Sequence, residues 1–155
     1  MTPAIKFLVR SGIPHTVHRY QIGAIDGTYG EAVAAALDVD PSRLFKTLVA
    51  RLKSGELVVG LVPVSGSLDL RRLAVAAGAK SADLAAPDDA ERATGYVTGG
   101  ISPFGQRRRL RTFADASLSN FETVFVSAGR RGLQVEVRPG DLMRALAVTA
   151  TSLAA

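Results

Sequence analysis

The sequence predicts a mixed α/β domain whose strands pair mainly antiparallel. Segments 45–64 and 123–138 each contain two β-rich runs around a short turn with glycine. This is the pattern of a β-hairpin, and hairpins join antiparallel strands. Helical segments with capping residues separate the strands, which indicates helices packed on a sheet. With 155 residues, the chain is long enough for one domain over 1–155 with a substantial core.

The first half contains two clear helix starts. Thr2 is placed to cap a helix that has Pro3 at its first position, and Thr28-x-x-Glu31 is a capping box. The expected elements are a helix from Pro3 to about Gly12, a strand at 15–20, a helix from 28 to about 38, a helical turn at 40–41, and strands at 45–52 and 57–64 around the turn at 53–56.

The second half continues the alternation. Its expected elements are a helix opened by Ser67 or Asp69 and ended by Gly78, a strand at 79–84, a helix from Pro87 to Gly95, strands at 96–98 and 110–113, strands at 123–127 and 133–138 around the turn at 129–132, and a last helix from 140–141. The end of the chain is made of small residues with weak patterning, so we expect about 148–155 to fray.

Composition excludes several classes of site. The chain has no cysteine, which rules out disulfides, a thiol nucleophile and cysteine metal ligands. Its two histidines, His15 and His18, are three apart on a predicted strand and should point to opposite faces, which makes a poor metal pair. We therefore expect neither metal nor cofactor. No apolar run is long enough to cross a bilayer and no signal segment is evident, so we expect a cytoplasmic protein.

Segment 94–112 combines a glycine-rich loop with dense positive charge. Gly99 and Gly100 lack a Cβ, so their backbone can approach a ligand closely, and the Pro of Ile101-Ser102-Pro103 stiffens the turn. Four arginines follow and supply +4 of the net charge of +5: Arg107, Arg108, Arg109 and Arg111. Such a segment suits an anionic ligand, nucleic acid above all, although a solvated basic surface is the alternative.

Four further polar residues stand out by position. By alternation, Lys46 shares a strand face with apolar residues, so its ammonium either reaches the sheet rim or points into a cleft. Tyr20 ends a predicted strand, where an aromatic commonly lies at the core or rim. Ser127 ends a hairpin strand and could face a pocket or serve the turn. Gln134 shares a face with Glu136, and exposed polar alternation explains both.

Taken together, the chain resembles the YbaK/EbsC family of editing domains related to the insertion domain of prolyl-tRNA synthetase. The resemblance covers residues 1 to about 147. The matching residues are Met1-Thr2-Pro3-Ala4, Phe45-Lys46-Thr47-Leu48, Pro63-Val64-Ser65-Gly66, Leu68-Asp69-Leu70, Thr94-Gly95-Tyr96, Gly99-Gly100-Ile101-Ser102-Pro103 with Gly105, Val126-Ser127, Gly132-Leu133 and Gly140-Asp141-Leu142.

This resemblance implies an enzyme that clears mischarged tRNA(Pro), Cys-tRNA(Pro) first, in trans and alongside prolyl-tRNA synthetase. It implies a mixed, mostly antiparallel sheet curled into an open barrel, and a monomer or weak dimer. In the chemistry proposed for such proteins, the substrate thiol attacks its own ester carbonyl. The implied residues are Lys46, Gly99, Gly100, Ile101 and Ser102 for catalysis, Tyr20, Pro103, Ser127 and Gln134 for the aminoacyl group, and Arg107, Arg108, Arg109 and Arg111 for tRNA.

Gln134 departs from the family pattern, in which close relatives carry an aspartate. A neutral amide cannot act as a carboxylate base. Clearance of Ala-tRNA(Pro), with water as the attacking group, is therefore a second hypothesis. A non-catalytic module that binds tRNA or the synthetase is a third, and an unrelated small-molecule binder, for which the arginine cluster would be incidental, is a fourth.

Overall fold

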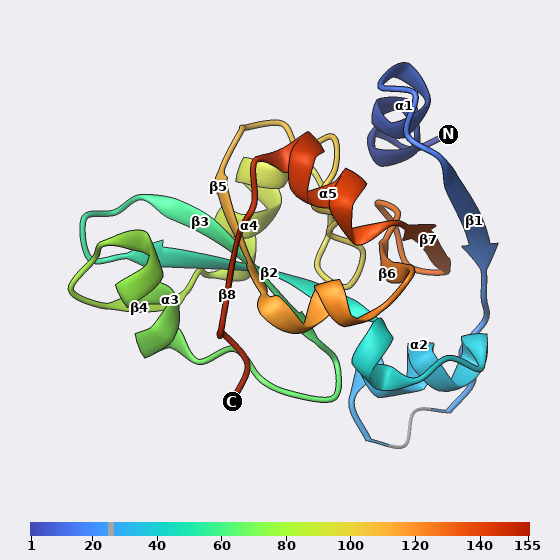
Figure 1. The fold of residues 1–155 in the computed structure, drawn as a ribbon, viewed down its shortest axis with the longest axis horizontal. Coiled ribbons are helices and arrows are strands. Elements are labelled where there is room, and N and C mark those ends of the chain that lie inside the picture. Colours follow the sequence, from blue (N-terminus) through green and yellow to red (C-terminus); the bar gives the residue numbers. More distant parts are fainter. Residues whose placement is uncertain (25–26) are drawn as a thin grey trace.

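The strands form two sheets (Figure 1). The structure is a computed structural model that describes residues 1–24 and 27–155. The larger sheet has the order β4-β2-β3-β5-β8 and the smaller one β1-β7-β6. The strands are β1 His15–Arg19, β2 Phe45–Leu52, β3 Leu57–Pro63, β4 Ala82–Leu84, β5 Arg111–Asp115, β6 Val124–Ser127, β7 Leu133–Val137 and β8 Thr149–Thr151. The helices are α1 Pro3–Arg10, α2 Tyr29–Leu37, α3 Leu70–Ala77, α4 Pro87–Thr94 and α5 Pro139–Leu146, with short 3-10 helices at Pro41–Arg43 and Ala116–Asn120.

Both predicted hairpins are confirmed. Strands β2 and β3 pair antiparallel, as do β6 and β7, and β1 and β4 add two further antiparallel pairings. Strand β5 lies parallel to β3, and β8 lies parallel to β5. The mixed α/β class with mainly antiparallel pairing is therefore confirmed.

The open barrel implied by the family resemblance is not found. Within residues 1–24 and 27–155, β1 and β6 end one sheet and β4 and β8 end the other, so neither closes on itself. A single parallel bridge between Leu44 and Phe125 links the start of β2 to β6. The two sheets instead enclose a core, to which α1, α4 and α5 also contribute.

The predicted helix starts are formed by the expected side chains. The Thr2 hydroxyl accepts the N–H of Ile5 at 3.3 Å, and the Thr28 hydroxyl accepts the N–H of Glu31 at 3.2 Å. Of the two candidates for α3, Asp69 is the cap. Thr2 also donates to the carbonyl of Ala128, which ties α1 to the end of β6.

The prediction of a frayed C-terminal tail is wrong. Strand β8 pairs with β5, and the side chain of Leu153 is fully buried. One carboxylate oxygen of Asp115 accepts the N–H groups of Leu153 and Ala154 at 2.8 and 2.9 Å. The segment is held by a carboxylate on β5, which is its neighbour in the sheet but lies far from it in the sequence. The local sequence pattern therefore gave no sign of this contact.

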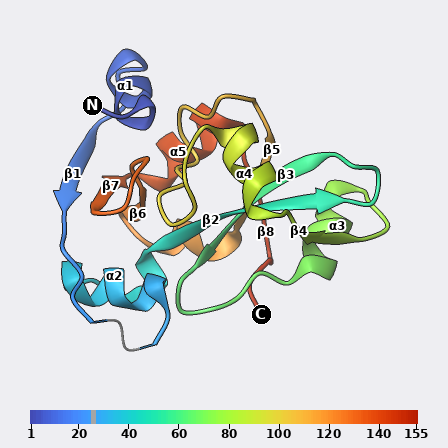
Figure 2. The same cartoon turned by 180° about the vertical axis from the view of Figure 1, so that it is seen from behind.

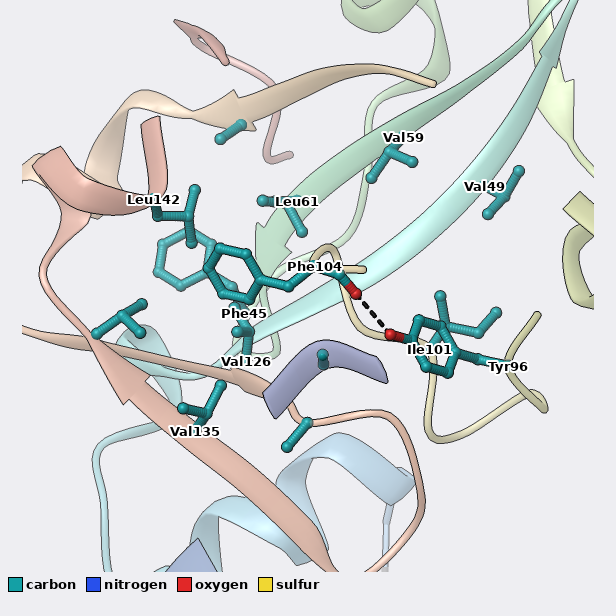
Figure 3. Packing of buried hydrophobic residues seen from close by; sticks show 14 of the residues in the cluster. Phe45, Val49, Val59, Leu61, Tyr96, Ile101, Phe104, Val126, Val135 and Leu142 are labelled. Atoms are coloured by element: carbon teal, nitrogen blue, oxygen red, sulfur yellow. Dashed lines mark hydrogen bonds between the residues drawn. The ribbon is translucent and has the colours of Figure 1, made fainter. Parts of the chain in front are cut away.

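The predicted strand at 96–98 is also wrong, because this segment begins a loop that enters the core. The N–H of Thr98 donates to Glu91 at 2.8 Å instead of to a neighbouring strand. Figure 2 shows the loop (yellow) between α4 and the β6–β7 hairpin. Phe104 is fully buried, and the Tyr96 hydroxyl donates to its carbonyl at 2.6 Å (Figure 3). Burial raises the pKa of Tyr96 to about 12, so the phenol stays a donor.

Candidate functional site

A cavity of about 440 Å³ lies where α2, β2, α4, the glycine loop and the ends of β6 and β7 meet. Five of the residues singled out from the sequence line it: Lys46, Gly99, Ile101, Ser127 and Gln134. The other lining residues are Thr28, Tyr29, Gly30, Val33, Leu44, Phe45, Thr47, Leu48, Val49, Val64, Leu84, Ala85, Pro87, Ala90, Thr98 and Arg131. The described lining is mainly apolar, with a few polar groups, as is usual for small-ligand sites.

Lys46 follows the first residue of β2. Its pairing opposite Val62 gives it the face shared with Leu48, as alternation predicted. It is partly exposed, lines the cavity, and forms no ion pair with any residue in the described ranges. Of the two placements left open by the sequence, the presence of Lys46 in the cavity lining favours the cleft.

Gln134 is buried, not exposed as its alternation with Glu136 indicated. Only 4% of its surface is accessible, and it lies opposite Ser127 across the β6–β7 pair. Among residues 1–24 and 27–155, its buried Oε1 atom has no hydrogen-bond partner, and neither has the buried Oγ1 of Thr47 on the cavity wall. Unpaired buried acceptors are costly, so these two atoms are suited to receive donors from a ligand.

Tyr20 reaches the site through a second tyrosine. It is nearly buried and is not among the lining residues, but its hydroxyl lies 3.1 Å from that of Tyr29, which does line the cavity. Burial, reinforced by the contact with Tyr20, raises the pKa of Tyr29 far above its ordinary value. The Tyr29 phenol is therefore neutral at physiological pH, and its contact with Tyr20 forms one polar edge of the site.

The two glycines of the loop allow close contact with the β6–β7 turn. A Cβ on Gly100 would lie 2.5 Å from Cα of Arg130, and one on Gly99 would lie 2.4 Å from Nε of Arg131. Gly99 also has a φ of +93°, a conformation that glycine adopts readily.

Of the loop residues that the resemblance implies for catalysis, two have backbone N–H groups that could bind charge on a carbonyl oxygen. The N–H of Gly100 donates to the carbonyl of Val97 at 2.9 Å and is occupied. Within the described part of the chain, the N–H groups of Gly99 and Ile101 have no acceptor. Gly99 and Ile101 also line the cavity, so they remain the candidates for this role.

Ser102 and Pro103 lie behind the cavity and do not line it. Ser102 is fully buried, and its hydroxyl accepts the N–H of Phe104 at 3.2 Å. Pro103 is buried against a different hollow, next to Phe7. Their position indicates that they shape the loop from the core side.

The arginine run is dispersed by the fold, and none of its members lines the cavity. Arg111 donates to both carboxylate oxygens of Glu56 at 2.8 and 2.9 Å, and this pairing lowers the pKa of Glu56. Arg107, Arg108 and Arg109 are exposed, and Arg108 lines a separate hollow that Arg51 also lines. The basic surface is therefore smaller than the sequence indicated.

Arg131 and Tyr29 are site residues that sequence reasoning missed. The guanidinium of Arg131 lies over the Tyr29 ring, 5.1 Å from its centre, and both line the cavity. In the sequence, Arg131 is an arginine in a hairpin turn and Tyr29 follows a helix cap. Residues of both kinds are common on protein surfaces. Only their long-range contact marks them.

No acidic residue and no histidine is among the described lining residues. His18 instead lies 2.9 Å from Glu136, and His15 bonds the carbonyl of Ile13. Within 1–24 and 27–155, no group of three or more potential metal-ligating side chains is found, and no helix has the length and apolarity to span a membrane.

The chain is similar to known aminoacyl-tRNA editing proteins. The family model for the aminoacyl-tRNA editing domain matches residues 27–145. The chain is 33% identical to the "Putative Cys-tRNA(Pro)/Cys-tRNA(Cys) deacylase EbsC" of Enterococcus faecalis over 92% of this chain and 86% of that protein. It is 30% identical to the "Multifunctional Ser/Thr-tRNA deacylase ProXp-y" of Escherichia coli over 64% and 62% of the two chains.

The fold also matches that of solved structures over nearly the whole chain. A crystal structure described as "a putative trans-editing enzyme for prolyl tRNA synthetase" superposes with a TM-score of 0.85 over 99% of this chain and 95% of that one, at 21% identity. At this identity the likeness concerns the fold alone.

Proposed function

Because the chain belongs to the aminoacyl-tRNA editing domain family, we propose that it is a trans-editing deacylase that cleaves the ester of mischarged tRNA(Pro), with Cys-tRNA(Pro) as the first candidate substrate. The observation that carries this proposal is the cavity itself. It offers a cation, two free backbone donors and polar acceptors, while its described lining holds no histidine or carboxylate to activate a nucleophile.

Such a site suits a reaction in which the substrate supplies the attacking group. The cysteine thiol forms a bond to its own carbonyl carbon, the carbon–oxygen bond to the terminal ribose breaks, and the thiol proton passes to the departing hydroxyl. The protein must hold the reacting atoms close and stabilise charge on the carbonyl oxygen. Lys46 and the N–H groups of Gly99 and Ile101 are the groups available for that charge.

A hydroxyl amino acid is the second candidate substrate. Oε1 of Gln134 and Oγ1 of Thr47 are buried acceptors to which no residue in the described part of the chain donates. A serine or threonine side chain could donate to them, which the methyl group of alanine cannot. The similarity to a relative named for Ser/Thr-tRNA deacylation points the same way, so Ala-tRNA(Pro) ranks behind both.

The partners of this activity are mischarged tRNA(Pro) and, alongside it, prolyl-tRNA synthetase, which produces the substrate. We propose that the protein acts in the cytoplasm as a monomer or weak dimer. The exposed arginines Arg107, Arg108 and Arg109 are candidates for contact with the tRNA backbone.

Deacylation of tRNA(Pro) charged with cysteine, serine, threonine, alanine or proline tests the proposal. We expect the cysteine or hydroxyl forms to be cleared and Pro-tRNA(Pro) to survive. Lys46→Ala should lower the rate by about a hundredfold or more, whereas Lys53→Ala, at an exposed lysine of the β2–β3 turn, should not. A protein that binds tRNA but leaves every charged form intact would instead be a non-catalytic binding module.

A further inference from the structure

We propose that Arg131 binds the phosphate of the terminal nucleotide of the tRNA at the cavity mouth. This inference rests on the proposed function, because it places the nucleotide that carries the aminoacyl ester. It adds a binding residue outside the arginine run that the sequence marked for tRNA.

The first support is that Arg131 is held in place. Its guanidinium lies over the ring of Tyr29 and also close to Gly99, where a Cβ would come within 2.4 Å of Nε. An arginine with both of these contacts has already lost part of its side-chain freedom. Binding an anion then costs less entropy than ordering a free surface arginine.

The second support is that its charge is not neutralised. Arg131 is exposed, and in the described ranges it makes no ion pair and donates no hydrogen bond. The described cavity lining contains two cations, Lys46 and Arg131, and no carboxylate. Arg111, by contrast, is bound to Glu56.

The third support is the chemistry of the two cations. A guanidinium presents paired N–H donors that match two phosphate oxygens, whereas an ammonium acts as a point charge. Arg131 therefore suits the phosphodiester, and Lys46, which lines the same cavity, suits the single oxygen of the ester carbonyl. The aminoacyl ester and its 5′ phosphate belong to one nucleotide, so one cavity can hold both.

The test is a double-mutant cycle between protein and RNA. Binding of two uncharged acceptor-stem minihelices of tRNA(Pro), one ending in CCA and one lacking the terminal adenosine with its phosphate, is measured by fluorescence anisotropy. We expect Arg131→Ala to weaken binding of the complete RNA by about ten- to a hundredfold and binding of the truncated RNA far less. Its salt slope with the complete RNA should fall by about 0.7.

Two controls sharpen the cycle. Arg130→Ala removes the neighbouring exposed arginine, which does not line the cavity, and should weaken both RNAs equally. Arg131→Lys keeps the charge without the planar fork and should fall between wild type and Arg131→Ala. Thermal melting shows whether each variant is folded.

Equal losses for both RNAs in Arg131→Ala, or no loss for either, would overturn the assignment. The cycle uses uncharged RNA, so it gives an answer even if no mischarged tRNA is hydrolysed. Absence of deacylation would defeat the proposed function, whereas additive binding losses would defeat the role of Arg131.

Discussion

Alanine substitutions at Gly99 and Gly100 test the contact between the glycine loop and the β6–β7 turn, with Gly55→Ala as the reference. We expect Gly100→Ala to be the most destabilising of the three. Gly55 has a φ of +97° and open space where a Cβ would lie, so Gly55→Ala measures backbone strain alone, about 1–2 kcal/mol. Gly100 lacks a positive φ, but its Cβ would lie 2.5 Å from Cα of Arg130. Carbon atoms prefer about 3.5–4.0 Å, so backbone must move by roughly 1 Å.

Overpacking of this size costs about 1–3 kcal/mol or more, because the obstructing atoms are backbone on both sides. Gly99→Ala combines strain at φ +93° with displacement of the Arg131 guanidinium. That side chain can swing into solvent, so the free energy of unfolding should fall only about as far as in Gly55→Ala. Binding of the complete minihelix should nevertheless fall as in Arg131→Ala.

Urea unfolding gives the stability change as a shift of the midpoint at constant slope. The anisotropy assay gives the functional change. If Gly100→Ala were no more destabilising than Gly55→Ala, the close contact with Arg130 would not exist in solution. If Gly99→Ala left RNA binding intact, the packing of Arg131 on that glycine would have no functional role.

Two other substitutions probe the polar contacts. Asp115→Ala should lower the free energy of unfolding by about 2–4 kcal/mol at pH 7, because it frees the N–H groups of Leu153 and Ala154. Burial opposes the charge of Asp115, but its hydrogen bonds hold its pKa below the ordinary value. The loss of stability in Asp115→Ala, measured by urea unfolding, should therefore be full above about pH 4 and shrink as the pH falls through the folded pKa. A loss that does not depend on pH would exclude the carboxylate as the cause. Arg111→Ala should lower the free energy of unfolding by less than about 1 kcal/mol, since the ion pair of Arg111 with Glu56 is exposed. Because Arg111 is bound to Glu56, the substitution should leave the salt slope of tRNA binding unchanged. A changed slope would show that Arg111 contacts phosphate.

Features fixed by neighbouring residues could be predicted from the sequence. The β2–β3 hairpin follows from two β-rich runs and their turn, and the caps of Thr2 and Thr28 act on N–H groups three residues away. Lys46 was also placed on its observed face, because alternation along a strand is local. What alternation left open was whether that face met solvent or a cavity.

Features fixed across the chain could not be predicted in this way. Gln134 looked exposed because its alternation with Glu136 matches a solvated face. In the fold it is buried between β1 and β6 and lines a cavity that α2 and β2, from earlier in the sequence, also line. Arg111 looked free because Glu56 lies 55 residues earlier. The sequence shows how many charged residues a segment has. The charge that is available to a ligand also depends on which of those residues the fold pairs with opposite charges.

The position of β8 has a consequence for how the chain folds. Leu153 is fully buried and bonded to Asp115, 38 residues earlier, while Thr2 bonds to Ala128, 126 residues later. Contacts between such distant segments slow folding, because long loops must close before their contacts add stability. One edge of β5 stays unpaired until the segment that contains β8 is added, so we expect native packing to be completed late in folding.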